Sequence, residues 1–179
     1  KFELVGYSMG GVIAASYSAR NPDRVKRLIL IAPAGTGHNL GISARVAKIP
    51  LFGWGLFLTF FGLQHVRSTK KDKDIKSSVP KIVERQLNEL LFKGFVPSVL
   101  ASIKGILSKD SYDDHKALRN ADFEILAFWG DCDTVIPIQC KEVLSSWNFS
   151  INNVVIRNGT HSLPFTHARE IIDGIYPGN

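Results

Sequence analysis

Cysteine is scarce in this sequence, and clustered charge is missing, which excludes several kinds of protein. Only two cysteines, Cys132 and Cys140, occur among 179 residues. Two are too few for a disulfide framework, and their spacing matches no zinc motif. The net charge is +6, but the basic residues are scattered, whereas nucleic-acid binding needs them gathered on one face. The sequence therefore predicts no disulfide scaffold, no metal site and no nucleic-acid partner.

Long apolar runs are also absent. The most apolar segment, residues 49–63, carries no charged residue and holds four phenylalanines and a tryptophan. It is shorter than the roughly 20 apolar residues that span a bilayer, and Pro50 and several glycines interrupt it. A buried helix is the default interpretation of such a run. A membrane-spanning helix is therefore not predicted.

An initiator methionine is missing too, because the chain starts at Lys1 and shows no signal-peptide cleavage site. We therefore expect the chain to begin inside a longer coding sequence. The rest of the composition is ordinary, with 45% hydrophobic and 21% charged residues. Such a composition is typical of a globular protein, and the length suits a single domain of about 100–200 residues.

The first motif of the chain is Gly6-Tyr7-Ser8-Met9-Gly10. The mostly apolar run 2–6 before it predicts a buried strand, and residues 12–20 after it, which are rich in small side chains, predict a helix. In that context a G-x-S-x-G turn holds Ser8 in a strained conformation, and the flanking glycines let strand and helix pass closely. The Met9 backbone N–H would then face an oxyanion. A purely structural turn is the alternative. A phosphate-binding loop lacks its Gly-Lys-Ser/Thr ending, so no cofactor is predicted.

A serine hydroxyl needs a base to take its proton and an acid to orient that base. The last predicted strand, 153–157, ends in a glycine-containing loop that carries His161, which makes His161 the predicted base. Two carboxylates, Asp131 and Asp133, follow the predicted strand 125–129 and compete for the role of the acid. The remaining histidines lack such a strand-end context. They are His38, His65, His115 and His167.

The sequence resembles the α/β-hydrolase family from its first residue to near its last. The resemblance rests on Gly6-Tyr7-Ser8-Met9-Gly10-Gly11, Ala14-Ala15, Asn21-Pro22-Asp23-Arg24-Val25 and Leu28-Ile29-Leu30-Ile31. It implies an α/β fold with a mostly parallel sheet. It also selects Asp133, three residues after the loop glycine Gly130, as the acid and leaves Asp131 as a solvated loop residue. The order Ser8, Asp133, His161 is the order that this fold uses.

The middle of the chain is long for a connection between two strands. About ninety residues separate the predicted strands near residues 32 and 123, far more than a crossover needs. By the resemblance, residues 36–116 form a helical cap, and residues 1–35 and 117–179 form the core. Helices are expected at 42–49, 51–61, 81–92, 96–107 and, as a short turn, near 115–120. Because about four strands normally precede the motif in this family, the chain should cover only the C-terminal two-thirds, without the N-terminal strands and the second oxyanion donor.

The resemblance implies a serine hydrolase that cleaves a lipophilic small-molecule carboxylic ester through an acyl-enzyme on Ser8, like esterases or monoacylglycerol lipases. Val135 and Leu163, each two residues beyond a predicted triad member, are expected to line the pocket. Residues 49–63 would act as a cap helix or as a lid that contacts acyl chains or a lipid surface. Two alternatives stay open: hydrolysis of a carbon–carbon bond by the same triad, and a non-catalytic ligand-binding protein of this fold.

Overall fold

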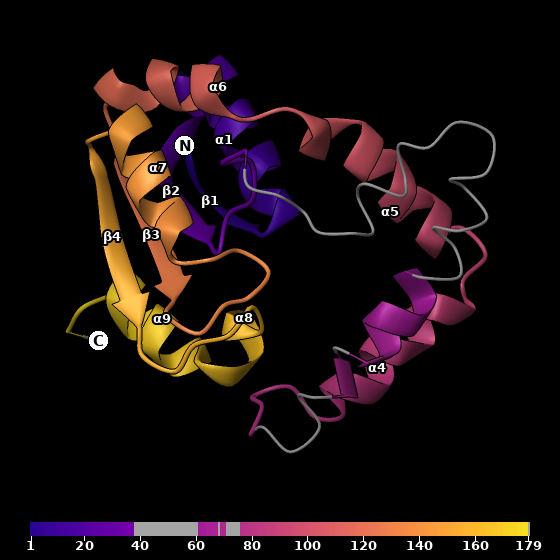
Figure 1. Cartoon of the computed structure of the whole chain (residues 1–179). Coiled ribbons are helices and arrows are strands. Elements are labelled where there is room, and N and C mark those ends of the chain that lie inside the picture. Colours follow the sequence, from indigo (N-terminus) through magenta and orange to yellow (C-terminus); the bar gives the residue numbers. More distant parts are fainter. Residues whose placement is uncertain (38–60, 68, 71–75, 179) are drawn as a thin grey trace. The chain divides into compact units, whose positions relative to one another are not determined.

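The computed structural model describes residues 1–37, 61–67, 69–70 and 76–178. The chain divides into two compact units (Figure 1), which we call the sheet unit (Lys1–His38 and Lys109–Asn179) and the helical unit (Asn39–Ser108). The strands of the sheet unit are β1 (Phe2–Tyr7), β2 (Val25–Ile31), β3 (Glu124–Gly130) and β4 (Ile151–Ile156). Its helices are α1 (Met9–Arg20), α6 (Tyr112–Ala117), α7 (Gln139–Trp147), α8 (Leu163–Thr166) and α9 (Ala168–Ile175).

The described strands form one parallel sheet in the order β1-β2-β3-β4. Strands β2 and β3 are central, and residues 28–31 and 125–130 are buried without the alternation of a half-exposed strand. Such continuous burial is expected where helices cover both faces of a parallel sheet. The mostly parallel α/β architecture predicted from the sequence is confirmed. All four strands run in one direction, so the loops after their carboxyl ends gather at one edge of the sheet (Figure 1).

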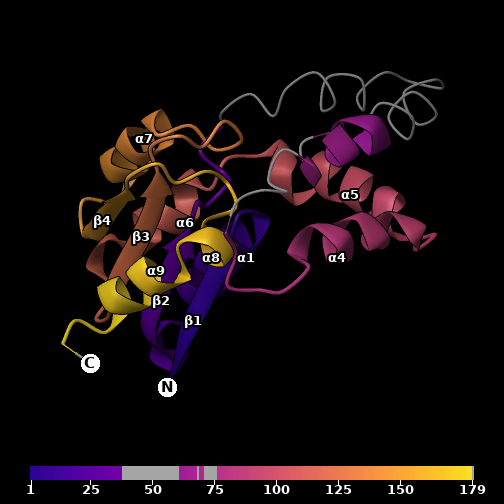
Figure 2. The ribbon, with the colours of Figure 1, turned by 90° about the horizontal axis from the view of Figure 1, so that it is seen from below.

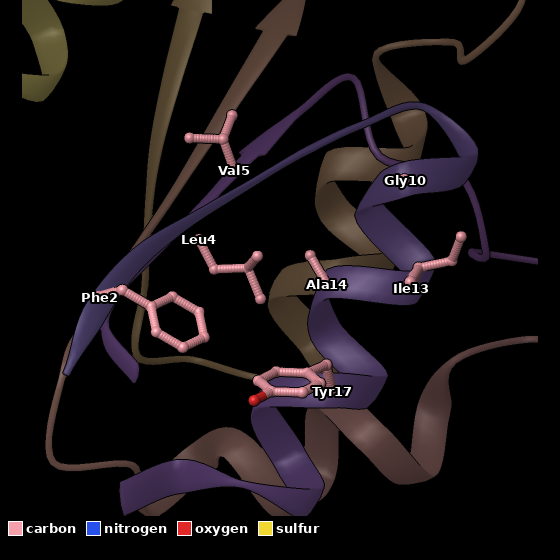
Figure 3. Close-up of a pocket in the computed structure, with 7 residues that line it drawn as sticks. All are labelled: Phe2, Leu4, Val5, Gly10, Ile13, Ala14 and Tyr17. Carbon is pink, nitrogen blue, oxygen red and sulfur yellow. The ribbon is translucent and has the colours of Figure 1, made fainter. Parts of the chain in front are cut away.

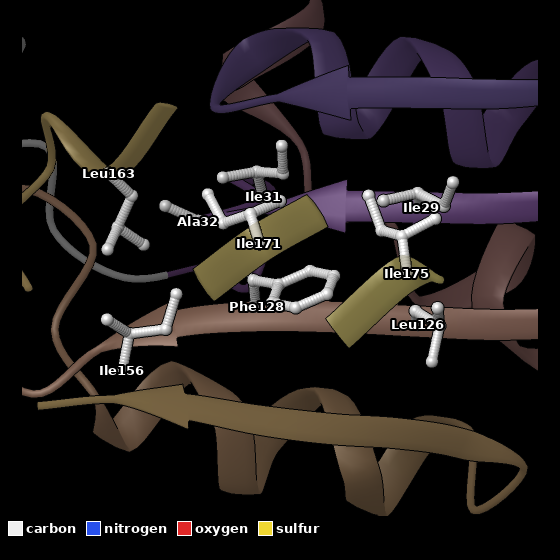
Figure 4. Close-up of a cluster of buried hydrophobic side chains, with 9 residues drawn as sticks. All are labelled: Ile29, Ile31, Ala32, Leu126, Phe128, Ile156, Leu163, Ile171 and Ile175. Carbon is white, nitrogen blue, oxygen red and sulfur yellow. The ribbon is translucent and has the colours of Figure 1, made fainter. Parts of the chain in front are cut away.

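A hydrophobic cluster fills the space between the sheet and α9 (Figure 4). Its members come from β2 and the residue after it, from β3 and β4, and from the last two helices: Ile29, Ile31, Ala32, Leu126, Phe128, Ile156, Leu163, Ile171 and Ile175. Helix α9 contributes Ile171 and Ile175, which lie one turn apart on its inner face, whereas the intervening Ile172 is 56% exposed. Helices α1, α6 and α7 cover the opposite face of the sheet (Figure 2).

Charged side chains form hydrogen bonds and ion pairs at the amino ends of the strands, opposite the edge where the carboxyl ends lie. Arg27 of β2 lies beside Glu3 of β1 and Glu124 of β3 in the strand register. Its guanidinium pairs with Glu124 at 3.0 Å and donates to the Ile175 carbonyl oxygen at 2.8 Å. The Tyr176 hydroxyl donates to Glu3 at 2.5 Å. These contacts attach the end of α9 to β1 and β2, and Arg27 also links β2 to β3.

An open apolar groove of about 490 Å³ follows β1 and α1 (Figure 3). Its lining consists of Phe2, Leu4, Val5, Gly10, Ile13, Ala14 and Tyr17. Strand β1 is an outer strand of the described sheet. Val5 and Ile13 are 54% and 50% exposed. Apart from the Tyr17 phenol, the lining offers no titratable side chain.

The described part of the helical unit is helical at residues 61–67 and 69–70, and further along the chain it contains two short α-helices, each followed by a 3₁₀ turn. These elements are α4 (Ile82–Asn88), Glu89–Leu91, α5 (Phe95–Lys104) and Ile106–Ser108. The expected helices at 81–92 and 96–107 are thus shorter than predicted, while the one at 42–49 and nearly all of 51–61 lie outside the described residues. No helix among the described residues is long and apolar enough to cross a membrane.

The apolar stripe expected to bury one face of residues 81–92 is only half-buried. Ile82, Val83, Leu87 and Leu90 are partly exposed, and Leu91 is 80% exposed. The helix tightens to 3₁₀ geometry at Glu89, which advances about 120° per residue instead of 100°. Leu91 therefore leaves the stripe that α-helical spacing predicts. Whether the helical unit acts as a cap stays a prediction.

Helix α6 buries His115, which is 1% exposed. Burial lowers the pKa of His115 to about 4, despite the opposing charge of Asp114, and its Nδ1 has no hydrogen-bond partner among the described residues. From pH 6.5 down to 4 the unfolded chain binds a proton that the folded chain does not. The free energy of unfolding should therefore decrease as the pH is lowered from 6.5 to 4, by up to about 3 kcal/mol. Urea unfolding curves at pH 7 and pH 5 measure this loss of free energy of unfolding, which should be smaller in His115→Gln than in the wild type. An equal loss in the two proteins would contradict the prediction.

Candidate active site

Ser8 occupies the turn between β1 and α1 in a strained backbone conformation, with φ 51° and ψ −117°. The backbone on both sides of the turn is fastened to the end of β2. The Ser8 N–H donates to the Ile31 carbonyl at 3.0 Å, and the Ser8 carbonyl accepts from the Ala34 and Gly11 N–H groups at 3.0 and 2.9 Å. A conformation of this kind costs about 1–3 kcal/mol and persists because its surroundings impose it.

Glycine is required at Gly6 because strand β1 and helix α1 pass too closely for a side chain. A Cβ on Gly6 would overlap the Gly10 carbonyl and lie 2.8 Å from the Ala14 Cβ. The same reason was expected for Gly10, but there a Cβ would meet no atom within 4 Å. The second close approach is at Gly11, whose Cβ would lie 2.7 Å from Pro33. The prediction was therefore right for Gly6 and wrong for Gly10, because Gly10 faces the open groove.

The structure brings Ser8, His161 and Asp133 together at the carboxyl edge of the sheet. The His161 Nε2 lies 3.0 Å from the Ser8 Oγ, and its Nδ1 lies 2.8 Å from the Asp133 Oδ2. A carboxylate can only accept, so Nδ1 carries the proton of the neutral ring and Nε2 presents its lone pair to the serine hydroxyl. This arrangement can remove the proton from Ser8 as its oxygen attacks an electrophile.

The turn after β3 points Asp133, and not Asp131, at the histidine. The Asp133 side chain is fully buried, and its Oδ1 accepts from the Val135 and Ile136 N–H groups at 2.7 and 2.8 Å. A buried carboxylate needs such donors. Asp131 is exposed, and its hydrogen bond raises the pKa of the neighbouring Cys132 thiol. Of the two candidate acids, only Asp133 contacts His161.

The loop that carries Asp133 and the loop that carries His161 are joined through their backbones. The Cys132 N–H donates to the Gly159 carbonyl oxygen at 2.9 Å. A Cβ on Gly130 would overlap that same carbonyl oxygen. The absence of a side chain at Gly130 lets the two loops approach, and the hydrogen bond links the loop of the acid to the loop of the base.

The other residues predicted for the site take varied positions. Met9 is the first residue of α1, directly after Ser8, which places its N–H at the positive end of the helix. Val135 is 50% exposed, whereas Leu163 is fully buried in the hydrophobic cluster behind the His161 loop. Their roles as pocket walls stay predictions. No group of acidic, histidine or cysteine side chains among the described residues could hold a metal ion.

Among the described histidines, the hydrogen bond to the Ser8 side chain comes from His161, and the others lie in different surroundings. His65 stacks against Phe61 in the helical unit, with ring centroids 5.6 Å apart. His115 is buried in α6, and the His167 Nδ1 lies 2.8 Å from the Thr166 hydroxyl. His38 lies outside the described residues. The strand-end argument thus singled out the one described histidine that faces the serine.

Sequence reasoning missed Tyr7, which lies directly before Ser8. Its hydroxyl donates to the His161 carbonyl oxygen at 2.6 Å, across 154 residues of chain. Its ring lies 5.1 Å from the His161 ring, and Phe165 packs edge-on against it. The one available signal was a phenol at the end of a mostly apolar strand, because a partly buried tyrosine hydroxyl needs a partner.

Comparison with known proteins identifies the family of the chain. Residues 1–168 match the family described as alpha/beta hydrolase fold. The chain belongs to the alpha/beta hydrolase family. A solved esterase from Thermogutta terrifontis has the same fold, with 22% identity and a TM-score of 0.66 over 98% of this chain and 63% of the esterase.

Curated members of the alpha/beta hydrolase family resemble the chain over most of its length. A pimeloyl-[acyl-carrier protein] methyl ester esterase of Wigglesworthia glossinidia brevipalpis is 23% identical over 92% of the chain and 64% of its own length. A 2-hydroxymuconate semialdehyde hydrolase of a Pseudomonas strain is 28% identical over 81% and 50%. Human monoacylglycerol lipase ABHD6 is 24% identical over 96% and 54%. The chain thus spans half to two-thirds of the length of these relatives.

Proposed function

We propose that the protein hydrolyses a carboxylic ester with an apolar acyl group through an acyl-enzyme on Ser8. The observation that carries this proposal is the hydrogen-bonded row of Ser8, His161 and Asp133, at 3.0 and 2.8 Å, behind a strained turn. A hydroxyl, an imidazole and a buried carboxylate in this order form an activated nucleophile. The names of the esterase and lipase relatives support the choice of an ester.

In the first half of the reaction the Ser8 Oγ attacks the ester carbonyl carbon while the His161 Nε2 takes the hydroxyl proton. The imidazolium is stabilised by Asp133. When the tetrahedral intermediate collapses, the bond to the alcohol oxygen breaks and His161 gives its proton to that oxygen. The alcohol leaves, and the acyl group stays on Ser8.

In the second half a water molecule attacks the acyl-enzyme, with His161 again acting as the base. The carboxylic acid departs, and the proton returns from His161 to the Ser8 oxygen, which restores the starting state. In both halves the Met9 N–H, at the positive end of α1, binds the oxyanion. The resemblance to the family implies a second donor from a segment N-terminal to the motif. Loss of one such donor costs about 10²–10³ in kcat.

Labelling with a fluorophosphonate probe and peptide mass mapping tests this proposal. The probe forms a bond from phosphorus to the Ser8 oxygen and releases fluoride, which requires an activated serine. We expect an adduct on Ser8 in the 179-residue chain extended upstream, and none in Ser8→Ala. Ser18→Ala is the matched control, because this buried serine of α1 lies away from His161. A folded protein without an adduct would contradict the proposal and favour a non-catalytic ligand-binding role.

Hydrolysis of a carbon–carbon bond by the same three residues is a second candidate. The observation in its favour is the relative named 2-hydroxymuconate semialdehyde hydrolase, at 28% identity. A panel of 4-nitrophenyl esters of increasing acyl length, run beside a dienoic ketoacid, separates the two. We expect kcat/KM to rise with acyl length and the ketoacid to stay intact. Cleavage of the ketoacid without cleavage of esters would replace the first proposal by the second.

A further inference from the structure

We propose that Tyr7 is a positioning residue that holds the His161 loop in register with Ser8. This inference rests on the proposed function, because it assigns a role in the same site. Tyr7 does not touch the reacting atoms. It acts on His161 through two contacts: the hydroxyl donates to the His161 carbonyl oxygen at 2.6 Å, and the phenol ring lies against the imidazole at 5.1 Å and 35°.

Because Tyr7 directly precedes Ser8 in the chain, these contacts link the base to the nucleophile. Tyr7 is the last residue of β1 and immediately precedes Ser8. The nucleophile and the group that holds the base are thus joined by one peptide unit, whereas His161 itself is 153 residues away from Ser8. A shift of the His161 backbone would have to break the bond to Tyr7. The hydrogen bond therefore limits movement of the His161 main chain relative to Ser8, and through it the distance between Nε2 and Oγ.

The surroundings make Tyr7 a rigid anchor. Its ring packs against the hydrophobic cluster beneath α9, and Phe165 of α8 meets it edge-on, with centroids 6.4 Å apart at 83°. The His161 loop, in contrast, contains Gly159 and makes a turn before α8. On its other side this loop is held by the Cys132 N–H at the Gly159 carbonyl. Tyr7 supplies a hydrogen bond to the main-chain carbonyl of His161, whereas the acid loop contacts the imidazole through Asp133 and the main chain at Gly159.

Tyr7→Phe tests the inference, because it removes the hydroxyl and keeps the ring. We expect kcat for the best 4-nitrophenyl ester to fall about 10- to 100-fold, since a misplacement of about 1 Å has effects of this size. KM should change less than about twofold, because no substrate contact is lost. The rate of Ser8 labelling by fluorophosphonate should fall by the same factor as kcat, because both steps need His161 to take the serine proton.

A double substitution separates positioning from a merely structural role. In a His161→Ala background there is no imidazole to position, so adding Tyr7→Phe should change the residual rate by less than about twofold. The matched control is Tyr176→Phe, which removes a tyrosine hydroxyl bonded to Glu3 at the far end of the sheet. It should leave kcat unchanged.

Two results would overturn the inference while the proposed function stands. One is a Tyr7→Phe variant whose rate of Ser8 labelling and whose kcat both equal those of the wild type. The other is an equal loss from Tyr7→Phe with and without the imidazole of His161, which would mean that Tyr7 acts on the fold in general. Absence of labelling in the folded wild-type protein would instead refute the proposed function, and the role of Tyr7 with it.

Discussion

Replacing His161 with alanine is expected to lower kcat by about 10⁴- to 10⁶-fold, the largest effect of any substitution outside Ser8 itself. The His161 Nε2, 3.0 Å from the Ser8 Oγ, is the base that the described structure offers to that hydroxyl. Without it, the serine keeps its proton as it attacks, and the leaving alcohol receives none. KM should change little. Steady-state hydrolysis of a 4-nitrophenyl ester measures both quantities, and a urea unfolding curve checks that the variant is folded.

The matched control for this substitution is His167→Ala. His167 lies near α8 and α9, as His161 does, but its Nδ1 is next to the Thr166 hydroxyl and not to Ser8. We expect kcat of this variant to stay within about threefold of the wild type, as is usual for changes away from a reacting group. A folded His161→Ala variant that keeps a tenth of the wild-type kcat would remove His161 from the mechanism.

Asp133→Asn should lower kcat by about 10⁴-fold although the two side chains have the same shape. The carboxylate now accepts the Nδ1 proton at 2.8 Å. Because the Oδ1 atom already accepts from the Val135 and Ile136 N–H groups, an asparagine would keep its oxygen there and turn its amide group toward His161. An amide N–H facing Nδ1 favours the tautomer with the proton on Nε2. That tautomer cannot take the proton of Ser8, and the charge that stabilises the imidazolium is lost.

The carboxylate two residues earlier provides the control for this change. Asp131→Asn makes the same chemical substitution on the same turn, but at an exposed side chain beside Cys132. Its kcat should differ from wild type by less than about threefold. Fluorophosphonate labelling rates for both variants give a second readout. The assignment of the acid would be reversed if Asp131→Asn were the slower of the two.

Local patterns in the sequence were sufficient to predict the sheet and the placement of two candidate site residues at its edge. The apolar runs around Leu28 and Leu126 are continuous, as strands of a parallel sheet covered on both faces must be, and the structure confirms that architecture. Ser8 and His161 were identified because each follows a strand end, beside glycines. Parallel strands end at one edge, so residues after different strands meet there however far apart they lie in the chain.

Other features depended on contacts that no local pattern encodes. The sequence alone left Asp131 and Asp133 competing, and the resemblance to a family was needed to choose. In the structure the choice depends on which carboxylate the Val135 and Ile136 N–H groups bind. The apolar stripe predicted at residues 81–92 also differs from the structure, because the helix changes to 3₁₀ geometry at Glu89 and Leu91 leaves the predicted face.

The hydrogen bond between Tyr7 and His161 shows where prediction from the sequence ends and the tertiary structure is needed. Local sequence patterns place Tyr7 just after one predicted strand and His161 after another, and they say nothing about a contact across 154 residues. The same holds for Gly6 and Gly10, which look equivalent in the motif although only Gly6 is confined by neighbouring atoms. Strand and turn preferences arise from neighbouring residues, so the sequence alone reveals them. The partner of a hydroxyl or the space around a glycine depends on which distant segments pack there, and only the tertiary structure decides it.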